Sequence, residues 1–385
     1  MADKPLPPIQ ISLPSTGDDE WQAVREPLMS GWLTQGPKVA AFETAFAAAH
    51  DVDFALATTS CTTALHLALA ALGIGPGDEV IVPSFTWVAT ANVVLYCGAT
   101  PVLADVDRST FNLDIDDTLA RVTDRTKAVI PVHLFGLCAD IDRLKSGLPA
   151  GIVIIEDAAC AAGAVYKGRF AGALGDAGAF SFHPRKSITT GEGGMMTTND
   201  PALADRANQL RNHGASISEE QRHAGPRPHL LPDFNLLGFN YRMTDLQGAV
   251  GLVQLNKLEQ FIEERAHRAA WYRQQLGSLN WLTLPDEPAD DGRHAWQSFV
   301  TYVLPEAAPR RRDDIMDDLL EKGIATRPGT HAIHQLGYYM DRFGFTDESF
   351  PGARDCAANT MALPLHNRMS DTDYQRVVDA LLSIR

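Results

Sequence analysis

The sequence lacks the features that mark secreted, membrane-spanning or disulfide-stabilised proteins. Its 385 residues include no apolar run long enough to cross a bilayer, and the first residues lack the apolar core of a signal peptide. The cysteines are odd in number and form neither a CxxC pair nor a regular spacing: Cys61, Cys97, Cys138, Cys160 and Cys356. We therefore predict reduced thiols and a cytoplasmic location.

Basic residues are also scarce. Lysine and arginine number 33 against 48 acidic residues, which gives a formal net charge of -15 at pH 7. Because nucleic acids and anionic membranes attract basic surfaces, we expect neither as a partner. A small anionic ligand needs only a few local donors and is not excluded. The histidines are dispersed without metal-ligand spacing, so no metal site is predicted.

Short runs rich in valine and isoleucine recur in the first half of the chain, at residues 80–83, 100–104, 128–133 and 152–155. Apolar runs that alternate with helical segments predict an α/β fold with a parallel sheet covered on both faces. A chain of this length exceeds the usual size of a single core. We expect a large domain over residues 1–255 and a smaller one over residues 256–385, where shorter strands and amphipathic helices follow.

One segment, residues 181–195 with the sequence SFHPRKSITTGEGGM, has the composition of a cofactor site. It places Lys186 between a polar turn and a run of threonines and glycines. An amine attacks a carbonyl only when it is neutral, and burial lowers the pKa of a lysine toward that state. Glycines also let a flat cofactor approach the backbone closely. Lys186 is therefore our candidate nucleophile, and a solvated loop lysine is the alternative.

Three further positions supply matching chemistry. Cys61 and Thr62 lie between a predicted strand at residues 54–57 and a helix, where backbone N–H groups and the helix dipole bind phosphate. Asp157 is the second residue after the predicted strand at residues 152–155, at the edge where sites gather in such sheets. Trp87 offers a flat face for a ring. The alternatives are a plain capped helix, an aspartate that caps the next helix and a core tryptophan.

These segments resemble the DegT/DnrJ/StrS family of sugar aminotransferases, including its perosamine-synthase-like members. The resemblance rests on residues 181–195 and on residues 238–247, GFNYRMTDLQ, and covers most of residues 30–250. It implies PLP-dependent transferase fold type I, as in aspartate aminotransferase: a mixed, mainly parallel sheet with helices on both faces and a smaller α+β carboxyl-terminal domain. It also implies that pyridoxal 5'-phosphate (PLP) is held by Lys186.

The resemblance assigns further roles at the cofactor. Trp87 would stack on the pyridine ring, Asp157 would keep the ring nitrogen protonated, and Ser181 would join Cys61 and Thr62 at the phosphate. Cys160 would lie near the ring hydroxyl. Many family members carry glutamine, glutamate or histidine at that position, and a thiol makes a weaker hydrogen bond.

Residues 238–247 imply an assembly. The family's asparagine that matches Asn240 reaches the phosphate of the neighbouring subunit, which implies a homodimer with shared active sites. Taken alone, Asn240 is an ordinary turn residue. Thr244 and Gln247 form a capping box, which predicts a helix that continues through Leu258.

Substrate contacts are less defined by the sequence. Thr34 lies in a segment, residues 30–37, that the family places at the active-site rim, although a plain connector has the same composition. Arg327 and His331 lie where family members vary with substrate, and solvated loop residues are the alternative.

The predicted activity is transfer of an amino group from glutamate to a keto-sugar. A nucleotide-linked 4-keto-6-deoxy sugar is the expected acceptor, in amino-sugar, surface-polysaccharide or antibiotic biosynthesis. The alternatives are a free keto-sugar acid or cyclitol as acceptor, a PLP-dependent sugar dehydratase or lyase, and a non-catalytic protein with the same fold. Retention of Lys186 speaks against the dehydratase branch, because that branch carries histidine at this position.

Overall fold

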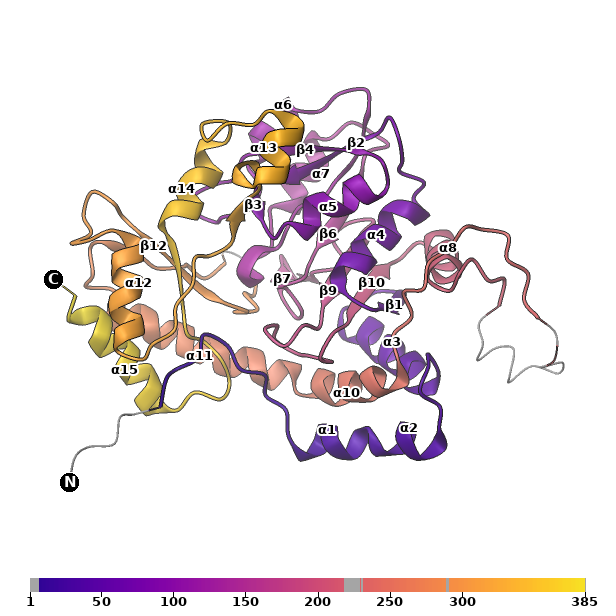
Figure 1. Cartoon of the computed structure of the whole chain (residues 1–385), viewed down its shortest axis with the longest axis horizontal. Coiled ribbons are helices and arrows are strands. Elements are labelled where there is room, and N and C mark those ends of the chain that lie inside the picture. The colour runs from indigo at the N-terminus through magenta and orange to yellow at the C-terminus, as the bar shows by residue number, and fades with distance from the viewer. Residues whose placement is uncertain (1–6, 218–228, 230, 289–290, 385) are drawn as a thin grey trace.

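The computed structural model describes residues 7–217, 229, 231–288 and 291–384. A central sheet with helices on both faces makes up most of the molecule, and a smaller group of strands and helices from the carboxyl-terminal part lies beside it (Figure 1). Helices α10 and α11 follow each other along the base of both parts, and α1 packs against α10 (Figure 1).

The central sheet has seven strands in the order β1-β10-β9-β6-β5-β2-β4. Their bounds are β1 Phe54–Thr58, β2 Glu79–Pro83, β4 Thr100–Ala104, β5 Thr126–Val129, β6 Val153–Asp157, β9 Ala177–Ser181 and β10 Gly194–Thr198. Neighbouring strands from β9 to β4 pair in parallel, whereas β10 pairs antiparallel with both β1 and β9. The predicted mixed, mainly parallel sheet is confirmed.

Side chains on the two faces of the central sheet fill two separate cores. Val80 and Val82 of β2 belong to one core, which packs against α4, α5 and α8, whereas Ile81 faces the core on the other side. Because successive side chains point to opposite faces of a sheet, an unbroken apolar run can cover both faces. This explains why the strands read as continuous valine and isoleucine runs.

The helices cover both faces of the central sheet and also build part of the carboxyl-terminal region. Their bounds are α1 Asp18–Ala23, α2 Arg25–Ser30, α3 Pro37–Ala49, α4 Cys61–Ala71, α5 Ala89–Tyr96, α6 Ile115–Ala120, α7 Ile141–Gly147, α8 Pro201–Arg211, α10 Asp245–Asn256, α11 Leu258–Leu276, α12 Arg312–Glu321, α13 Gly337–Phe343, α14 Pro351–Asn359 and α15 Asp371–Leu382. The capping box of Thr244 and Gln247 at α10 is confirmed. The predicted continuation through Leu258 is wrong, because α10 ends at Asn256 and Lys257 separates it from α11.

The carboxyl-terminal part builds a further core around a three-stranded antiparallel sheet in the order β11-β12-β14. The strands of this sheet are β11 Leu282–Thr283, β12 Phe299–Val303 and β14 Thr360–Leu363. The remaining short strands and 3-10 turns of the described chain are β3 Phe85–Thr86, η1 Leu134–Gly136, β7 Val165–Tyr166, β8 Arg169–Phe170, β13 His331–Ala332 and η2 Ile333–Gln335. Ile333, Tyr339 and Phe350 pack into the core of the large sheet. Residues 327–359 thus bridge the two parts, and the division at residue 255 stays a prediction.

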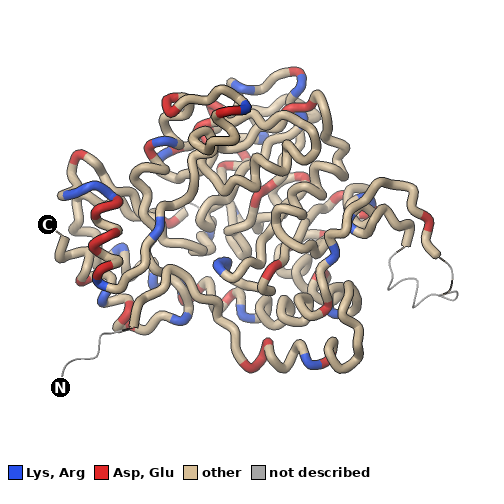
Figure 2. The backbone as a smooth tube through the Cα atoms, in the orientation of Figure 1, with Lys and Arg blue, Asp and Glu red and all other residues tan. Residues whose placement is uncertain are grey.

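Charge is spread over the whole molecule. Figure 2 shows lysine and arginine positions interspersed with acidic ones. Helix α12 carries one arginine, Arg312, which is followed by acidic residues. Within the part of the chain that the structure describes, no helix is both long enough and apolar enough to pass through a membrane.

Candidate active site

A cavity of about 890 Å³ lies at the carboxyl ends of the parallel strands, between the large sheet and residues 327–336. Parallel strands end at one edge of a sheet, and their connecting loops meet there. The structure brings nine of the eleven predicted site residues to the walls of this cavity: Cys61, Thr62, Trp87, Asp157, Cys160, Ser181, Lys186, Arg327 and His331.

Lys186 lies in a turn after β9, and its amine contacts a thiol. The backbone N–H of Lys186 donates to the carbonyl of His183 at 2.9 Å, and its Nζ lies 3.1 Å from Sγ of Cys160. Burial lowers the pKa of Lys186, but Cys160, Cys61 and Asp157 together outweigh burial and raise that pKa. Our expectation of a lowered pKa is thus wrong for the protein without ligand, because three acidic groups surround the amine.

Asp157 ends β6 with its carboxylate at the cavity wall. The hydroxyl of Thr90 donates to Oδ2 at 2.8 Å, and the backbone N–H of Ala159 donates to Oδ1 at 3.2 Å. Burial raises the pKa of Asp157, whereas the bond from Thr90 and the charge of Lys186 lower it. The net direction is upward. A cationic partner in the cavity would therefore stabilise this carboxylate further.

The start of α4 forms a cradle for an anion. The side chain of Ser60 caps the helix by accepting the N–H of Thr63 at 3.1 Å, so Cys61 and Thr62 are the first helical residues at the cavity wall. Gly194 of β10 passes so close that a Cβ there would lie 2.3 Å from the carbonyl carbon of Ser60. A glycine at this point of the GEGG sequence is required by that close approach.

Trp87 and His331 meet at the mouth of the cavity. Their rings lie 5.4 Å apart in an edge-to-face arrangement, because β13 pairs with β3 and sets His331 opposite Thr86. The side chain of Trp87 is 61% exposed, so one face of the indole is available to a ligand. Ser181, at the end of β9, completes the wall near Lys186.

Two predicted residues lie outside this cavity. Thr34 is exposed in the turn before α3, and Asn240 is exposed in a segment whose backbone pairs with Asn212. The predicted role of Asn240 in a neighbouring subunit stays a prediction. Thr34 does not line the cavity of its own chain, so its contact with a substrate stays a prediction.

Two residues that matter to the geometry were not predicted. The hydroxyl of Thr90 donates to Asp157 and so orients its carboxylate. In the sequence, a threonine within the mainly apolar stretch after Trp87 could have indicated this role. Arg185 precedes Lys186 and lines the same cavity as Arg327. Burial lowers the pKa of Arg327, and the nearby charge of Arg185 lowers it further. Among the described residues, neither arginine forms an ion pair.

The donor set fits PLP. The cavity combines an amine that can bind an aldehyde, a carboxylate suited to a protonated ring nitrogen, an exposed indole face and a helix start for a phosphate. The cofactor would be held by Lys186, Asp157, Trp87 and the first turn of α4. It would supply an electron sink next to the carbon that loses a proton.

Comparisons with known proteins agree with this geometry. The model of the DegT/DnrJ/EryC1/StrS aminotransferase family matches residues 14–382. The GDP-perosamine synthase of Caulobacter vibrioides is 41% identical over 378 residues, which cover 98% of each chain.

Solved structures have the same fold over nearly the whole chain. A putative sugar aminotransferase, Spr1654 of Streptococcus pneumoniae in its PLP form, matches with a TM-score of 0.89 at 30% identity over 97% of each chain. DesI, solved in the presence of its TDP-sugar product, matches with a TM-score of 0.86 at 32% identity over 97% of this chain and 92% of its own. The chain therefore belongs to the DegT/DnrJ/EryC1/StrS family and is a PLP-dependent sugar aminotransferase of fold type I.

Proposed function

We propose that this enzyme transfers an amino group from glutamate to a nucleotide-linked 4-keto-6-deoxy sugar. The observation that carries the proposal is the placement of Lys186 and Asp157 in one cavity that opens past Trp87 and His331. A relative is named GDP-perosamine synthase, and DesI was solved in the presence of a TDP-sugar product. Both names support a sugar nucleotide as the acceptor.

The proposed roles follow from the contacts. Lys186 holds the cofactor, and its amine moves the proton once the donor has replaced it. Asp157, oriented by Thr90, keeps the ring nitrogen protonated. Trp87 covers one face of the ring, and Ser181 with the N–H groups of Cys61 and Thr62 binds the phosphate. Cys160 lies beside the ring hydroxyl.

Arg185 and Arg327 are suited to bind an anionic part of a substrate. Both are exposed at the wall of the cavity, and neither is neutralised by a carboxylate of the described residues. A guanidinium binds a carboxylate or phosphate through two hydrogen bonds. We infer that this pair binds a carboxylate of glutamate or a phosphate of the acceptor, and that His331 contacts the acceptor. Thr34 stays a prediction.

We infer a homodimer with shared active sites. Asn240 is exposed outside its own cavity, and large apolar side chains are exposed in the preceding segment: Leu231, Phe234 and Leu237. Leu237 is 94% exposed. Exposed apolar side chains that gather in one segment are typical of a surface that a partner covers.

Shared sites can be tested by subunit mixing. Lys186→Ala and Asn240→Ala chains should each be nearly inactive, but mixed dimers contain one site with both residues intact. Random mixing should restore about one quarter of the wild-type activity. Activity of the mixture that equals the mean of the two variants alone would contradict shared sites.

We also infer a cytoplasmic location. All five cysteines are free thiols, including the buried Cys61 and Cys356. Free thiols persist in a reducing compartment.

The acceptor can be identified with matched substrates. Enzyme, PLP and glutamate are incubated with GDP- and dTDP-linked 4-keto-6-deoxy sugars and, separately, with a free keto-sugar acid and a keto-cyclitol. We expect an aminated product by mass spectrometry only with a nucleotide-linked sugar. Amination of the free acid or cyclitol alone would replace the proposed acceptor, and release of ammonia or water without amine transfer would indicate lyase chemistry.

A further inference from the structure

The contact between Cys160 and Lys186 joins two loops that leave the sheet side by side. Cys160 lies three residues after the end of β6, and Lys186 lies five residues after the end of β9. Because β6 and β9 pair in parallel, with Asp157 opposite Ala179, both loops begin at the same edge. The result is a distance of 3.1 Å between Sγ and Nζ.

Both groups are accessible to small solutes. Cys160 and Lys186 are half-buried and line the cavity of about 890 Å³, which is open to solvent at Trp87. Hydrogen peroxide is small compared with a cavity of about 890 Å³. The thiol therefore meets both requirements for oxidation, which are access and a nearby cation.

The other thiols lie in different surroundings. Burial raises the pKa of Cys97 to about 11 and that of Cys356 to about 12, and it raises the pKa of Cys61 and Cys138 as well. A protonated thiol is a poor nucleophile toward peroxide. Among the five, Cys160 alone donates to or accepts from a lysine amine in the described structure.

We propose that peroxide oxidation of Cys160 leads to a reversible covalent bond between its Sγ and Nζ of Lys186. In the first step, the sulfur attacks peroxide, the O–O bond breaks, and a sulfenic acid and one water form. The sulfur is oxidised by two electrons, and the peroxide is reduced. In the second step, the lysine lone pair attacks the sulfur, the S–O bond breaks, and the leaving hydroxide takes a proton from the amine as water.

The first step also prepares the amine for the second. Burial lowers the pKa of Lys186, and the contact with the Cys160 sulfur, together with Cys61 and Asp157, opposes burial and raises that pKa. Oxidation replaces the sulfur that contacts Nζ with a neutral sulfenic acid, so it weakens the largest of the effects that oppose burial. A larger fraction of Lys186 is then neutral and nucleophilic.

The bond would withdraw the amine that holds PLP, and this consequence rests on the proposed role of Lys186. It can form only while the amine is free, so bound PLP should protect the pair. A thiol such as glutathione reverses the bond: its sulfur attacks Sγ, the S–N bond breaks and the amine regains a proton. A second thiol then reduces the mixed disulfide.

The test uses mass spectrometry of the full chain, with and without PLP, after treatment with hydrogen peroxide. Trypsin cuts beside Lys145, Lys167, Arg185 and Arg206, so the bond joins residues 146–167 to residues 186–206, with Lys186 uncut. We expect this linked pair at about 2 Da below the sum of the two peptides, because two hydrogens leave. The linked pair should be at least about tenfold less abundant with PLP bound and should disappear with dithiothreitol.

Two variants serve as controls. Cys160→Ser should give no linked pair, whereas Cys97→Ser, which removes another half-buried thiol outside the cavity, should give the same amount as the wild type. The wild-type peptide map stands on its own if Cys160→Ser does not fold. Cys160 recovered only as sulfinic or sulfonic acid, or mainly as a disulfide with Cys61, with Lys186 cut normally, would overturn the proposal. This readout needs no substrate, so its failure is separate from a failure of the proposed amine transfer.

Discussion

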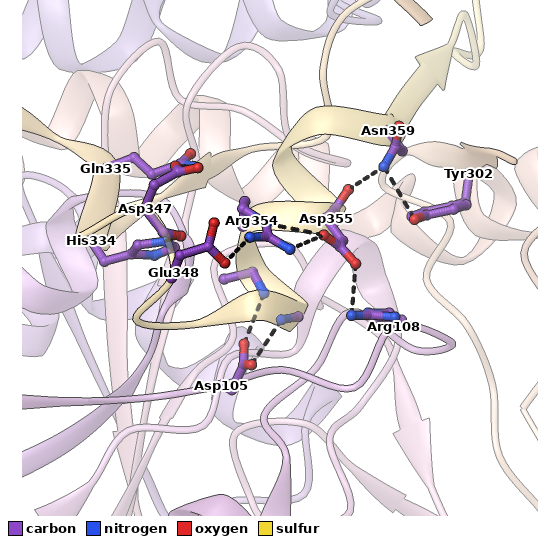
Figure 3. Close-up of polar contacts among 12 residues, drawn as sticks. Asp105, Arg108, Tyr302, His334, Gln335, Asp347, Glu348, Arg354, Asp355 and Asn359 are labelled. Atoms are coloured by element: carbon purple, nitrogen blue, oxygen red, sulfur yellow. Dashed lines mark hydrogen bonds and ion pairs between the residues drawn. The ribbon is translucent and has the colours of Figure 1, made fainter. Parts of the chain in front are cut away.

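Two aspartates at the ends of parallel strands in the same sheet have different roles. Asp105 directly follows β4, and its carboxylate accepts the N–H groups of Gly352 and Ala353, both at 2.8 Å, and that of Val106 at 2.9 Å (Figure 3). It therefore caps the first turn of α14 from a different part of the chain. Its neighbours Arg354 and Asp355 form surface ion pairs, as does Arg108 (Figure 3).

Asp157 ends β6 and has fewer close protein donors. It accepts from the hydroxyl of Thr90, from one backbone N–H and, at 3.9 Å, from the thiol of Cys61, and its carboxylate lines the cavity. A carboxylate at the end of a strand therefore does not by itself mark a site. Asp105 is satisfied by backbone donors and holds two parts of the fold together, whereas Asp157 keeps acceptor capacity for a ligand.

Substitution of Asp157 should have the largest effect of the changes described below, and that effect should be on catalysis. Asp157→Asn removes the charge that holds the ring nitrogen protonated, so we expect kcat/KM for amine transfer to fall by about 10²-fold or more. Thermal unfolding should change little, because the amide oxygen can still accept the N–H of Ala159 while the Thr90 hydroxyl, which can also accept, faces the NH2 group. Activity within a few-fold of the wild type would remove the distinction between the two aspartates.

The matching change at the other aspartate should act on stability. Asp105→Asn replaces one acceptor oxygen with a donor and leaves an N–H of α14 without its partner, which costs about 1–3 kcal/mol. Chemical denaturation should show this loss, whereas kcat at a temperature where the variant is folded should stay near the wild-type value. A large loss of kcat with unchanged stability would show that Asp105 also serves the site.

Thr90→Val isolates the contribution of the hydroxyl that donates to Asp157, because valine keeps the shape of the side chain and removes only that hydroxyl. Burial already raises the pKa of Asp157, and the Thr90 hydroxyl opposes that effect. Without it the pKa rises further, so a carboxylate needed in its charged form is lost at a higher pH. We expect about a tenfold loss of activity and an acid limb of the pH profile that moves upward. Thr90→Ser should retain both properties, and an unmoved acid limb in Thr90→Val would contradict the assignment.

Arg354→Gln should have the smallest effect. Its guanidinium pairs with Glu348 and Asp355 at the surface of α14, and exposed pairs contribute about 0.2–1 kcal/mol. Neither kcat nor KM should change. A stability loss as large as that of Asp105→Asn would show that the ion pairs, rather than the Asp105 cap, hold α14.

The sequence predicts the parts of this molecule that depend on local pattern. The strand runs, the capping box of α10 and the approach of Lys186 to the strand ends follow from periodicity, turn chemistry and a family resemblance. The break at Lys257 was missed, because apolar spacing continues unchanged from α10 into α11.

What the sequence does not predict depends on contacts between distant segments. His331 meets Trp87 only because β13 pairs with β3, and that short antiparallel pair has no signature of its own. The raised pKa of Lys186 depends on Cys160, Cys61 and Asp157, which come from other loops. The residues around Lys186 in the sequence predict burial, which lowers its pKa, but they do not predict the groups from other loops that raise it.

The most direct test of the account is the visible absorption spectrum of the purified chain with PLP, before and after addition of glutamate alone, for the wild type and Lys186→Ala. We predict that the wild type shows the band of covalently bound PLP and loses it with glutamate, as the cofactor is converted to its aminated form. Lys186→Ala should show only the spectrum of free PLP. The same glutamate-sensitive band in Lys186→Ala, or a wild-type band that glutamate leaves unchanged, would contradict the account.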